Sequence, residues 1–338
     1  MGAVTQSRSL FKSTLGVLSV AKRTRGQVLQ PIGKKRSWGE IVARDFRVNW
    51  AVYVMALPVL AYFIIFNYIP MTGIIMAFQK FQIKKGIWGS KFVGLANFVR
   101  FFNSPYAWRL IRNTLLISIY GLAFSFPLPV IFALCLNEVR STKFKRITQT
   151  ISYMPYFISI VVVVAILFDF CKSDGALTKL AAMFGWSGGA LISSPEWFRT
   201  LYIGSNLWQH LGYNSIIFIS ALAAIDPQLY EAATIDGANR WQQTIHVTLP
   251  GISATIVVLL ILRLGQIMGV GYEKTILMYS PATYETGDII ASYVYRVGME
   301  DADYSYSTAI NLFNSVTNLV VLFLANQLSR RIGDTSLW

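Results

Sequence analysis

Long apolar stretches separated by short polar connections make up most of this 338-residue chain. Five windows without a Lys, Arg, Asp or Glu cover residues 51–79, 113–137, 147–168, 200–225 and 304–329. A sixth apolar stretch, 250–272, contains a single arginine, Arg263. Each is long enough for the roughly 20 residues that a helix needs to cross about 30 Å of hydrocarbon. The pattern therefore predicts an all-α integral membrane protein with six transmembrane helices.

Composition agrees with this fold class. Hydrophobic residues make up 54% of the chain and charged residues only 14%. This is too apolar for an ordinary soluble domain of this length. The connections between the apolar stretches are too short for a separate extramembrane domain, so we expect one helical bundle.

The formal net charge of +14 is unevenly distributed. Residues 1–49 hold ten Lys or Arg against two acids, which predicts a basic cytoplasmic tail followed by an interfacial segment. A membrane domain over 50–329 with six spans returns the C-terminal tail, 330–338, to the cytoplasm. The loop 80–112 disagrees, because it carries seven cations and no acid yet falls outside in this topology. We expect a multi-pass membrane protein with both termini cytoplasmic.

A punctuated helical segment lies between the fourth and fifth stretches, at residues 226–250. Asp226 can cap a helix that begins at Pro227, and Gly237 can provide the left-handed turn that ends it. The small Ala232 and Ala233 side chains would let another protein approach closely. The segment therefore predicts a docking element, with an interfacial turn as the alternative.

The charged and aromatic residues of this segment have distinct expected roles. Glu231 and Asp236 would add charged contacts at the rim of the docking element. On the next short helix, Trp241 and Ile245 share a face. We expect both to pack against the bundle, which would leave Asn239 and Arg240 exposed.

Specific residues in this segment resemble the EAA loop of permease subunits in bacterial ATP-binding-cassette importers. The resemblance rests on Glu231-Ala232-Ala233, Gly237 and Val247-Thr248-Leu249-Pro250. Val247 stands where isoleucine is usual, and Thr244 stands where many members have an aromatic residue. Further segments resemble the oligosaccharide and polysaccharide branch of the carbohydrate importers, over roughly residues 45–338. They are Asn67-Tyr-Ile-Pro70, Arg112-Asn113-Thr114, Asn137-Glu138-Val-Arg140, Ile151-Ser152-Tyr153-Met-Pro155 and Ser336-Leu337-Trp338.

The resemblance implies a type I, maltose-permease-like bundle that imports oligosaccharides or polysaccharide fragments. It implies four partners: a second permease subunit, two ATPase subunits and an extracytoplasmic solute-binding protein. ATP and Mg would be bound by the partner ATPase, since this chain has no phosphate-binding GxxxxGK[ST] loop and is not expected to be an enzyme. The ATPase-docking residues implied by the motif are Glu231, Ala232, Ala233, Asp236, Gly237, Leu249 and Pro250.

Two polar stripes within the apolar stretches are candidates for a substrate pathway. Asn206, His210 and Asn214 recur every four residues, and the last stretch carries Asn311, Asn314 and Asn318. Amide side chains suit sugar hydroxyls because they both donate and accept hydrogen bonds. Nearby Trp208, Tyr213 and Tyr272 could stack against sugar rings. The alternative is that the polar residues join helices by hydrogen bonds within the membrane.

Arg263 would lie roughly 18 Å along the fifth helix, at 1.5 Å per residue. An arginine at this depth needs a partner or a wet cavity. It could pair within the protein, or it could present its guanidinium group to the carboxylate of a uronate sugar. Gln266, three residues later, is a further pathway candidate.

Other classes of function have weaker support. Two histidines and the isolated Cys135 and Cys171 provide no metal-binding or disulfide pattern, so we expect no metal site. The dispersed cations accompany no nucleic-acid motif, so we expect no nucleic-acid partner. An ion- or proton-coupled secondary transporter remains the alternative, although it would normally need acids within the spans. A membrane enzyme would need a catalytic cluster that the sequence lacks.

Overall fold

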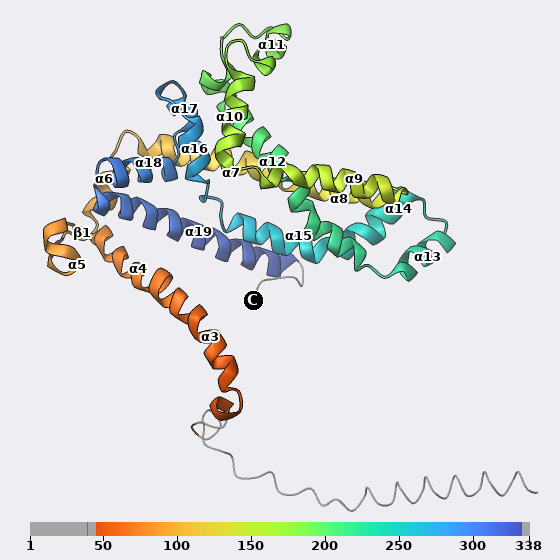
Figure 1. The fold of residues 1–338 in the computed structure, drawn as a ribbon, viewed down its shortest axis with the longest axis horizontal. Coiled ribbons are helices and arrows are strands. Elements are labelled where there is room, and N and C mark those ends of the chain that lie inside the picture. The colour runs from red at the N-terminus through yellow and green to blue at the C-terminus, as the bar shows by residue number, and fades with distance from the viewer. Residues whose placement is uncertain (1–38, 40–44, 333–338) are drawn as a thin grey trace, which may run out of the picture. The chain divides into compact units, whose positions relative to one another are not determined.

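The computed structural model describes residue 39 and residues 45–332, and Figure 1 shows its fold. Most of the tail predicted over 1–49, and the end of the tail predicted over 330–338, lie outside these residues. The chain divides into two compact units, Met1–Met71 and Thr72–Trp338.

The described part of the first unit is helical and apolar on every side. It contains α3 (Trp50–Phe63), a π-helical turn η2 (Ile64–Tyr68) and α4 (Ile69–Met71). None of the residues of these three elements is buried within the structure. A helix that is hydrophobic all round is typical of a membrane span.

The second unit is a helical bundle that starts with a short hairpin region. Its first elements are η3 (Thr72–Phe78), β1 (Gln79–Lys80), η4 (Ile83–Lys85), α5 (Gly86–Gly89), β2 (Lys91–Phe92) and α6 (Ala96–Phe102). The strands β1 and β2 pair antiparallel, with Gln79 opposite Phe92.

Longer helices follow in the second unit. The middle of the chain forms α7 (Ala107–Ser125), α8 (Pro127–Glu138), α9 (Thr142–Tyr153), η5 (Met154–Phe157), α10 (Ile160–Cys171), α11 (Ala176–Met183), η6 (Leu191–Ser193), α12 (Pro195–Ala223), α13 (Pro227–Ile235) and α14 (Arg240–Gln243). The remainder forms η7 (Thr244–Thr248), α15 (Leu249–Leu264), α16 (Tyr272–Met278), η8 (Pro281–Thr283), α17 (Tyr284–Gly287), α18 (Ile290–Tyr295), η9 (Arg296–Glu300) and α19 (Tyr304–Ile332).

Four of the described helical stretches are long and apolar enough to cross a membrane, and two bent pairs raise the number to six. The four are Trp50–Phe78, Ala107–Glu138, Arg240–Leu264 and Tyr304–Arg331. The bent pairs are Thr142–Phe157 with Ile160–Cys171, and Pro195–Ala223 with Pro227–Ile235.

Two predicted spans differ from the structure. The stretch 147–168 is not one straight helix, because the chain turns by 98° between η5 and α10. Pro155 lies just before this turn, and Ser159 caps α10 by accepting a hydrogen bond from the Val162 amide. The stretch predicted over 250–272 is helical only as far as Leu264, and residues 265–271 form turns and irregular chain.

Prolines explain two further irregularities. The π-helical turns η2 and η7 end two residues before Pro70 and Pro250 respectively. A proline lacks the backbone donor and crowds the carbonyl of the preceding turn, so a wider turn there relieves the clash.

Helix α12 lies at the centre of the second unit and packs against α7, α8, α9 and α15. A Cβ atom placed on Gly212 would lie 2.2 Å from the backbone oxygen of Ser152 in α9, so glycine allows these two helices to touch. Buried apolar clusters lie along the bundle. One joins Phe198 and Ile289, a second joins Leu110 and Ile310, and a third joins Phe218, Leu222 and Ile252.

The segment 288–296 contains the short helix α18, and Ile289, Ile290 and Ser292 are fully buried. The segment packs against α7, α16 and α19, which cover its apolar side chains.

Candidate transport pathway and coupling loop

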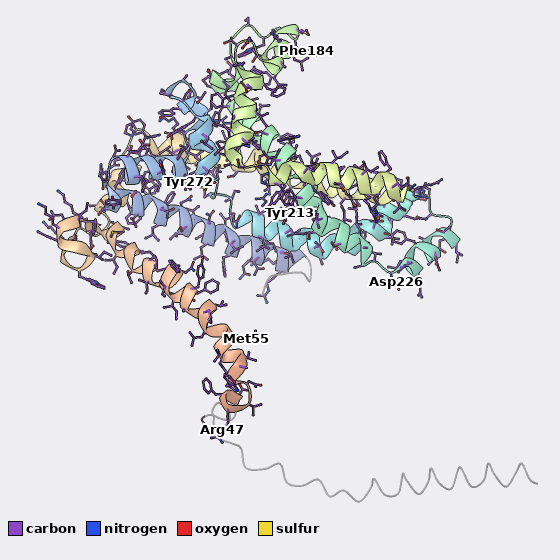
Figure 2. All side chains as sticks on the ribbon, viewed as in Figure 1. Arg47, Met55, Phe184, Tyr213, Asp226 and Tyr272 are labelled. Atoms are coloured by element: carbon purple, nitrogen blue, oxygen red, sulfur yellow. The ribbon has the colours of Figure 1, made fainter. Side chains whose placement is uncertain are left out.

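The loop 226–250 folds as the capped helix that its sequence predicts. The Asp226 carboxylate accepts a hydrogen bond from the Gln228 amide at 3.0 Å, and Pro227 occupies the first turn of α13. Gly237 has φ +79°, a conformation that other residues rarely adopt. The Ala238 amide then donates to the Ala233 carbonyl at 2.9 Å, which closes the helix end. Figure 2 labels Asp226 at the junction of α12 and α13.

The second half of the loop is tied to the bundle by polar contacts. Asn239 and Gln242 form a reciprocal capping box at the start of α14. The Tyr230 and Thr248 hydroxyls lie 3.0 Å apart, which joins α13 to the residues before α15. Arg240 pairs with Glu138 at the end of α8, with its Nη1 2.8 Å from the carboxylate.

The exposed face of the loop is partly apolar. Ile235 is 86% exposed and Trp241 is 72% exposed. The expectation that Trp241 packs against the bundle is wrong, and Ile245 is also exposed. Arg240 is exposed, as expected, and it also forms an ion pair with Glu138. The loop contacts the bundle through polar side chains and leaves its large apolar side chains outside.

The residues that the motif implies for docking lie at or near this exposed surface. Glu231, Ala232, Asp236, Gly237 and Pro250 are exposed. Ala233 and Leu249 are half-buried. Figure 1 shows α13 and α14 at one end of the second unit and α6 and α18 at the opposite end.

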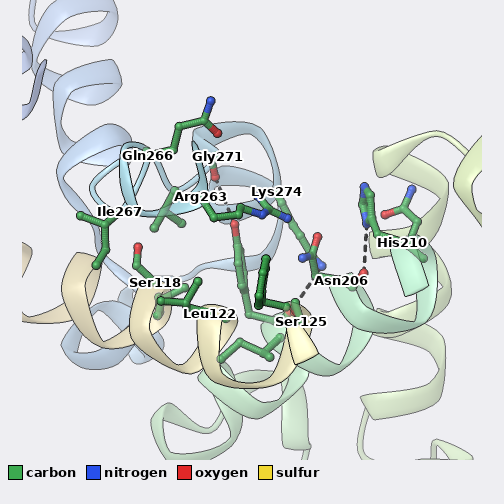
Figure 3. Close-up of a pocket in the computed structure, with 18 of the residues that line it drawn as sticks. Ser118, Leu122, Ser125, Asn206, His210, Arg263, Gln266, Ile267, Gly271 and Lys274 are labelled. Carbon is green, nitrogen blue, oxygen red and sulfur yellow. Dashed lines mark hydrogen bonds between the residues drawn. The ribbon is translucent and has the colours of Figure 1, made fainter. Parts of the chain in front are cut away.

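A cavity of about 620 Å³ lies between α7, α12 and the segment around residues 263–274. Figure 3 shows residues of its wall, which include Asn206, His210, Arg263, Gln266 and Lys274. His210 lies 3.0 Å, through Nδ1, from the Asn206 carbonyl oxygen one turn earlier. The size and the mixture of apolar and polar groups are typical of small-molecule sites.

A second cavity, of about 440 Å³, shares part of this wall. Ser125, Phe126, Arg263 and Gln266 line both cavities. Asn214 and Tyr213 line the second cavity, which lies farther along α12 toward the loop 226–250. The polar stripe of α12 is thus divided between the two cavities, and Arg263 lies where they adjoin.

The Arg263 guanidinium makes no ion pair with any residue of the described chain. Its side chain is exposed on the wall common to both cavities. An arginine in the apolar stretch of α15 therefore faces a cavity and has no internal counterion within the described ranges. This arrangement can receive an anion.

The asparagines of α19 are placed differently. Asn318 accepts a hydrogen bond from the Met268 amide at 2.8 Å, and so joins α19 to the turn after α15. Asn314 has a buried side-chain oxygen without a hydrogen-bond partner, and Asn311 is exposed. None of the three lines either of the two cavities.

The cavity residues that the sequence pattern did not indicate include Tyr202, Gln209 and Lys274. The Gln209 amide donates to the Ile158 carbonyl at 2.9 Å, at the break that precedes α10. Lys274 contacts Tyr202, 72 positions earlier in the chain. Helical periodicity reports only on nearby residues, so no local signal identifies these contacts.

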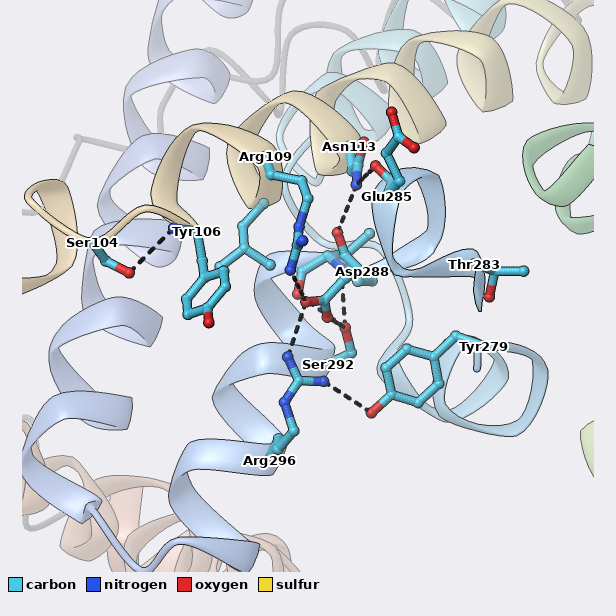
Figure 4. Close-up of polar contacts among 12 residues, drawn as sticks. Ser104, Tyr106, Arg109, Asn113, Tyr279, Thr283, Glu285, Asp288, Ser292 and Arg296 are labelled. Carbon is cyan, nitrogen blue, oxygen red and sulfur yellow. Dashed lines mark hydrogen bonds and ion pairs between the residues drawn. The ribbon is translucent and has the colours of Figure 1, made fainter. Parts of the chain in front are cut away.

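A buried ionic cluster lies at the end of the unit away from the loop (Figure 4). Asp288 is fully buried and binds two guanidinium groups through Oδ2, Arg109 at 3.3 Å and Arg296 at 2.9 Å. Ser292 donates to its Oδ1 at 3.0 Å. Although burial lowers the pKa of Arg296, the hydrogen bond and charge of Asp288 raise it above its ordinary value. The cluster joins α7 to α18.

An apolar bundle with broken spans, adjoining polar cavities and an exposed capped loop defines an integral-membrane transport subunit. Comparison with known proteins makes the class specific. Residues 125–334 match the family model described as binding-protein-dependent transport system inner membrane component. The chain therefore belongs to this family, the permease components of ATP-binding-cassette transporters.

Individual relatives are similar over most of their length. The polygalacturonan/rhamnogalacturonan transport system permease protein YteP of Bacillus subtilis (strain 168) is 42% identical over 85% of this chain and 90% of its own. Protein LplB of the same organism is 40% identical over 95% of this chain and 99% of its own. A crystal structure of a bacterial alginate ABC transporter, in complex with alginate pentasaccharide-bound periplasmic protein, contains a chain that is 42% identical. It covers 87% of this chain and 99% of that chain, with a TM-score of 0.80.

Family membership confirms several predictions from the sequence. The chain is an inner-membrane permease built of helices, apart from the short strands β1 and β2, and ATP is hydrolysed by a separate subunit. Family membership excludes the alternative of an ion- or proton-coupled secondary transporter, because members of this family belong to transport systems that depend on a binding protein.

Proposed function

We propose that this chain forms half of the translocation pathway of an importer for acidic oligosaccharides or polysaccharide fragments. The observation that carries the proposal is Arg263, an arginine without an internal counterion on the wall common to two cavities. A guanidinium group can bind a carboxylate through two parallel hydrogen bonds. Similarity to proteins named for polygalacturonan, rhamnogalacturonan and alginate supports the same substrate class.

The neighbouring polar groups suit the rest of a sugar. Asn206, Asn214 and Gln266 offer amides that both donate and accept hydrogen bonds. Tyr213 and Tyr272, which line the second and the first cavity respectively, offer ring faces for pyranose groups. We therefore assign the sugar pathway to the two adjoining cavities.

Coupling would occur through the loop 226–250, which we propose as the docking site of a separate ATPase. Its residues Glu231, Ala232, Asp236 and Gly237 are exposed at the end of the bundle. The complex would contain a second permease subunit, two ATPase subunits that bind ATP and Mg, and an extracytoplasmic binding protein. Both termini of this chain would then be cytoplasmic, on the same side as the loop.

Movement of the docked ATPase would pass to the cavities through α15. The contact between Tyr230 and Thr248 links α13 to the start of this helix, and Arg263 lies near its end. Closure of the ATPase pair on binding ATP would rotate the permease as a rigid body and open the cavities outward. Hydrolysis would reset them inward.

Uptake by the reconstituted complex tests this function. Vesicles containing both permeases and the ATPase would be supplied with binding protein, internal ATP and labelled oligouronates of increasing length. We expect ATP-dependent accumulation of oligouronates that exceeds accumulation of neutral oligosaccharides of equal length. Accumulation of neutral sugars alone would contradict the assigned substrate class.

A further inference from the structure

A second cation without a counterion lines the larger cavity. Lys274 is only 5% exposed, and its ammonium donates a hydrogen bond to the Tyr202 carbonyl oxygen at 3.0 Å. Its Nζ also lies 4.8 Å from the centre of the Tyr202 ring. Within the described ranges, no carboxylate lies within ion-pair distance of this ammonium. An ammonium has three donors, so one carbonyl leaves part of its capacity unused.

The position of Lys274 is fixed by its surroundings. Tyr202 is buried, and its hydroxyl donates to the Gly271 carbonyl at 3.3 Å, just before α16. Thr275, the next residue, is fully buried and donates to the same carbonyl at 3.2 Å. The lysine is therefore held by a packed shell, whereas a surface lysine would be free to move.

The charge of the cavity wall is unbalanced. Lys274 and Arg263 both line it, and Glu273 is the one acid among the lining residues of the described chain. Glu273 is exposed and pairs with neither cation. A buried cation is stable when an opposite charge compensates for its lost hydration. Burial alone lowers the pKa of the Lys274 ammonium to about 7, because no nearby carboxylate opposes the effect of burial.

We propose that Lys274 and Arg263 together form a carboxylate-binding site for the uronate groups of a passing oligosaccharide, with Lys274 as the residue that selects charged over neutral sugars. This inference rests on the proposed function. Lys274 lies on α16, beyond the end of α15, whereas Arg263 lies where the two cavities adjoin. A carboxylate that enters the larger cavity meets both cations, and Arg263 can retain it at the entrance to the second cavity.

Two matched substrates test the selection. One is an oligouronate, and the other is the same oligosaccharide after its carboxylates are reduced to primary alcohols, so that length and linkage are unchanged. The complex would carry Lys274→Gln, which removes the charge, or Lys274→Arg, which keeps it. Lys179→Gln, at an exposed lysine of α11, serves as the control.

We expect Lys274→Gln to reduce uptake of the oligouronate by about tenfold or more, since a hydrogen bond to a charged group typically contributes this much. Uptake of the reduced sugar should change little, and Lys274→Arg should recover part of the preference. Lys179→Gln should leave both substrates unaffected. An assembled Lys274→Gln complex with an unchanged preference for the oligouronate would overturn the inference while the proposed function stands. A wild-type complex that takes up no oligouronate would overturn both.

A pH profile of the wild-type complex keeps the inference testable if Lys274→Gln does not assemble. Lys274 carries a positive charge below its pKa of about 7 and is a neutral amine above it. Because the neutral amine attracts a carboxylate less, KM for the oligouronate should rise several-fold from pH 6 to pH 8. KM for the reduced sugar should stay constant. The other titratable or charged residues of the cavity wall are Tyr202, His210, Arg263, Tyr272 and Glu273. The helices α10 and α18, which pack against α16, add Asp169, Cys171, Tyr293 and Tyr295. The variant His210→Gln tests whether the pH dependence of KM comes from His210 or from Lys274. If this variant loses the pH dependence, the effect belongs to His210 and the inference is contradicted.

Discussion

Replacing Asp288 with Asn should destabilise the bundle strongly. The side chain is fully buried, and its Oδ2 lies 3.3 Å from Arg109 and 2.9 Å from Arg296. Asn has nearly the same shape but no charge, and its amide nitrogen cannot accept a hydrogen bond. The substitution would leave two guanidinium groups near each other without a shared carboxylate.

The size of the effect follows from these distances. At an effective dielectric constant of about 20, each charge pair near 3 Å contributes roughly 5 kcal/mol of Coulomb attraction, before the cost of desolvation is subtracted. Removing one partner of a buried pair typically costs about 3–5 kcal/mol, and we expect a value in this range. Both arginines are partly exposed, which favours the lower end.

Asp303→Asn is the matched control. Asp303 pairs with Arg100 at 2.6 Å, but the Arg100 side chain is exposed and the Asp303 side chain is only half-buried. Asn can also keep the hydrogen bond from the Tyr306 amide that Asp303 accepts. An exposed pair contributes about 0–1 kcal/mol, so this variant should behave nearly as the wild type.

Thermal unfolding of the purified complex, followed by tryptophan fluorescence in one detergent, compares the variants. We expect Asp288→Asn to lower Tm several times more than Asp303→Asn. Equal shifts for the two variants would refute the reasoning, because burial of the charge would then have no energetic consequence.

Three further predictions concern the loop, the cavities and the helix packing. Gly237→Pro should reduce uptake at least about tenfold while ATPase activity persists, because proline fixes φ near −65° and removes the amide that bonds Thr234. Gly185→Pro is its control, since Gly185 also has positive φ and its amide also donates to a carbonyl three residues earlier. Equal uptake by both variants would argue against coupling at the loop. Arg263→Gln should reduce uptake of oligouronates more than that of neutral sugars, and an equal loss would remove the carboxylate assignment. Gly212→Leu should lower the free energy of unfolding by about 1–3 kcal/mol through overpacking, and so lower Tm. Gly204→Leu is its control, because no atom lies near the Cβ position of Gly204, and it should leave Tm unchanged. Similar Tm values for the two variants would contradict the close packing of α9 on α12.

Much of the fold is contained in the local sequence pattern. The predicted stretch 51–79 agrees with the helical stretch Trp50–Phe78, and 304–329 lies within α19. These spans are continuous apolar runs, so length and composition suffice to identify them. Pro155 in the stretch 147–168 favours a kink, but the sharpness of the 98° turn after η5 does not follow from the sequence, because the stretch is apolar on both sides of the turn. The Ile158 carbonyl released there is satisfied by Gln209, which is distant in sequence.

The candidate sites divide in the same way. Caps and turns are local, so Asp226, Pro227 and Gly237 could be assigned their backbone roles from the sequence. The burial of Lys274 depends on Tyr202, and that of Asp288 depends on Arg109, 179 positions earlier. Such contacts arise from the packing of helices, which periodicity does not specify.

The central claim is that this chain has no energy source of its own and moves sugar only when a separate ATPase acts through the loop 226–250. The most direct measurement is uptake of a labelled oligouronate into vesicles that contain the two permeases, with and without the ATPase, ATP and the binding protein. We predict accumulation against a gradient only when all components are present, and its loss in the complex with Gly237→Pro. Accumulation against a gradient by the permeases alone, without nucleotide, would contradict the claim.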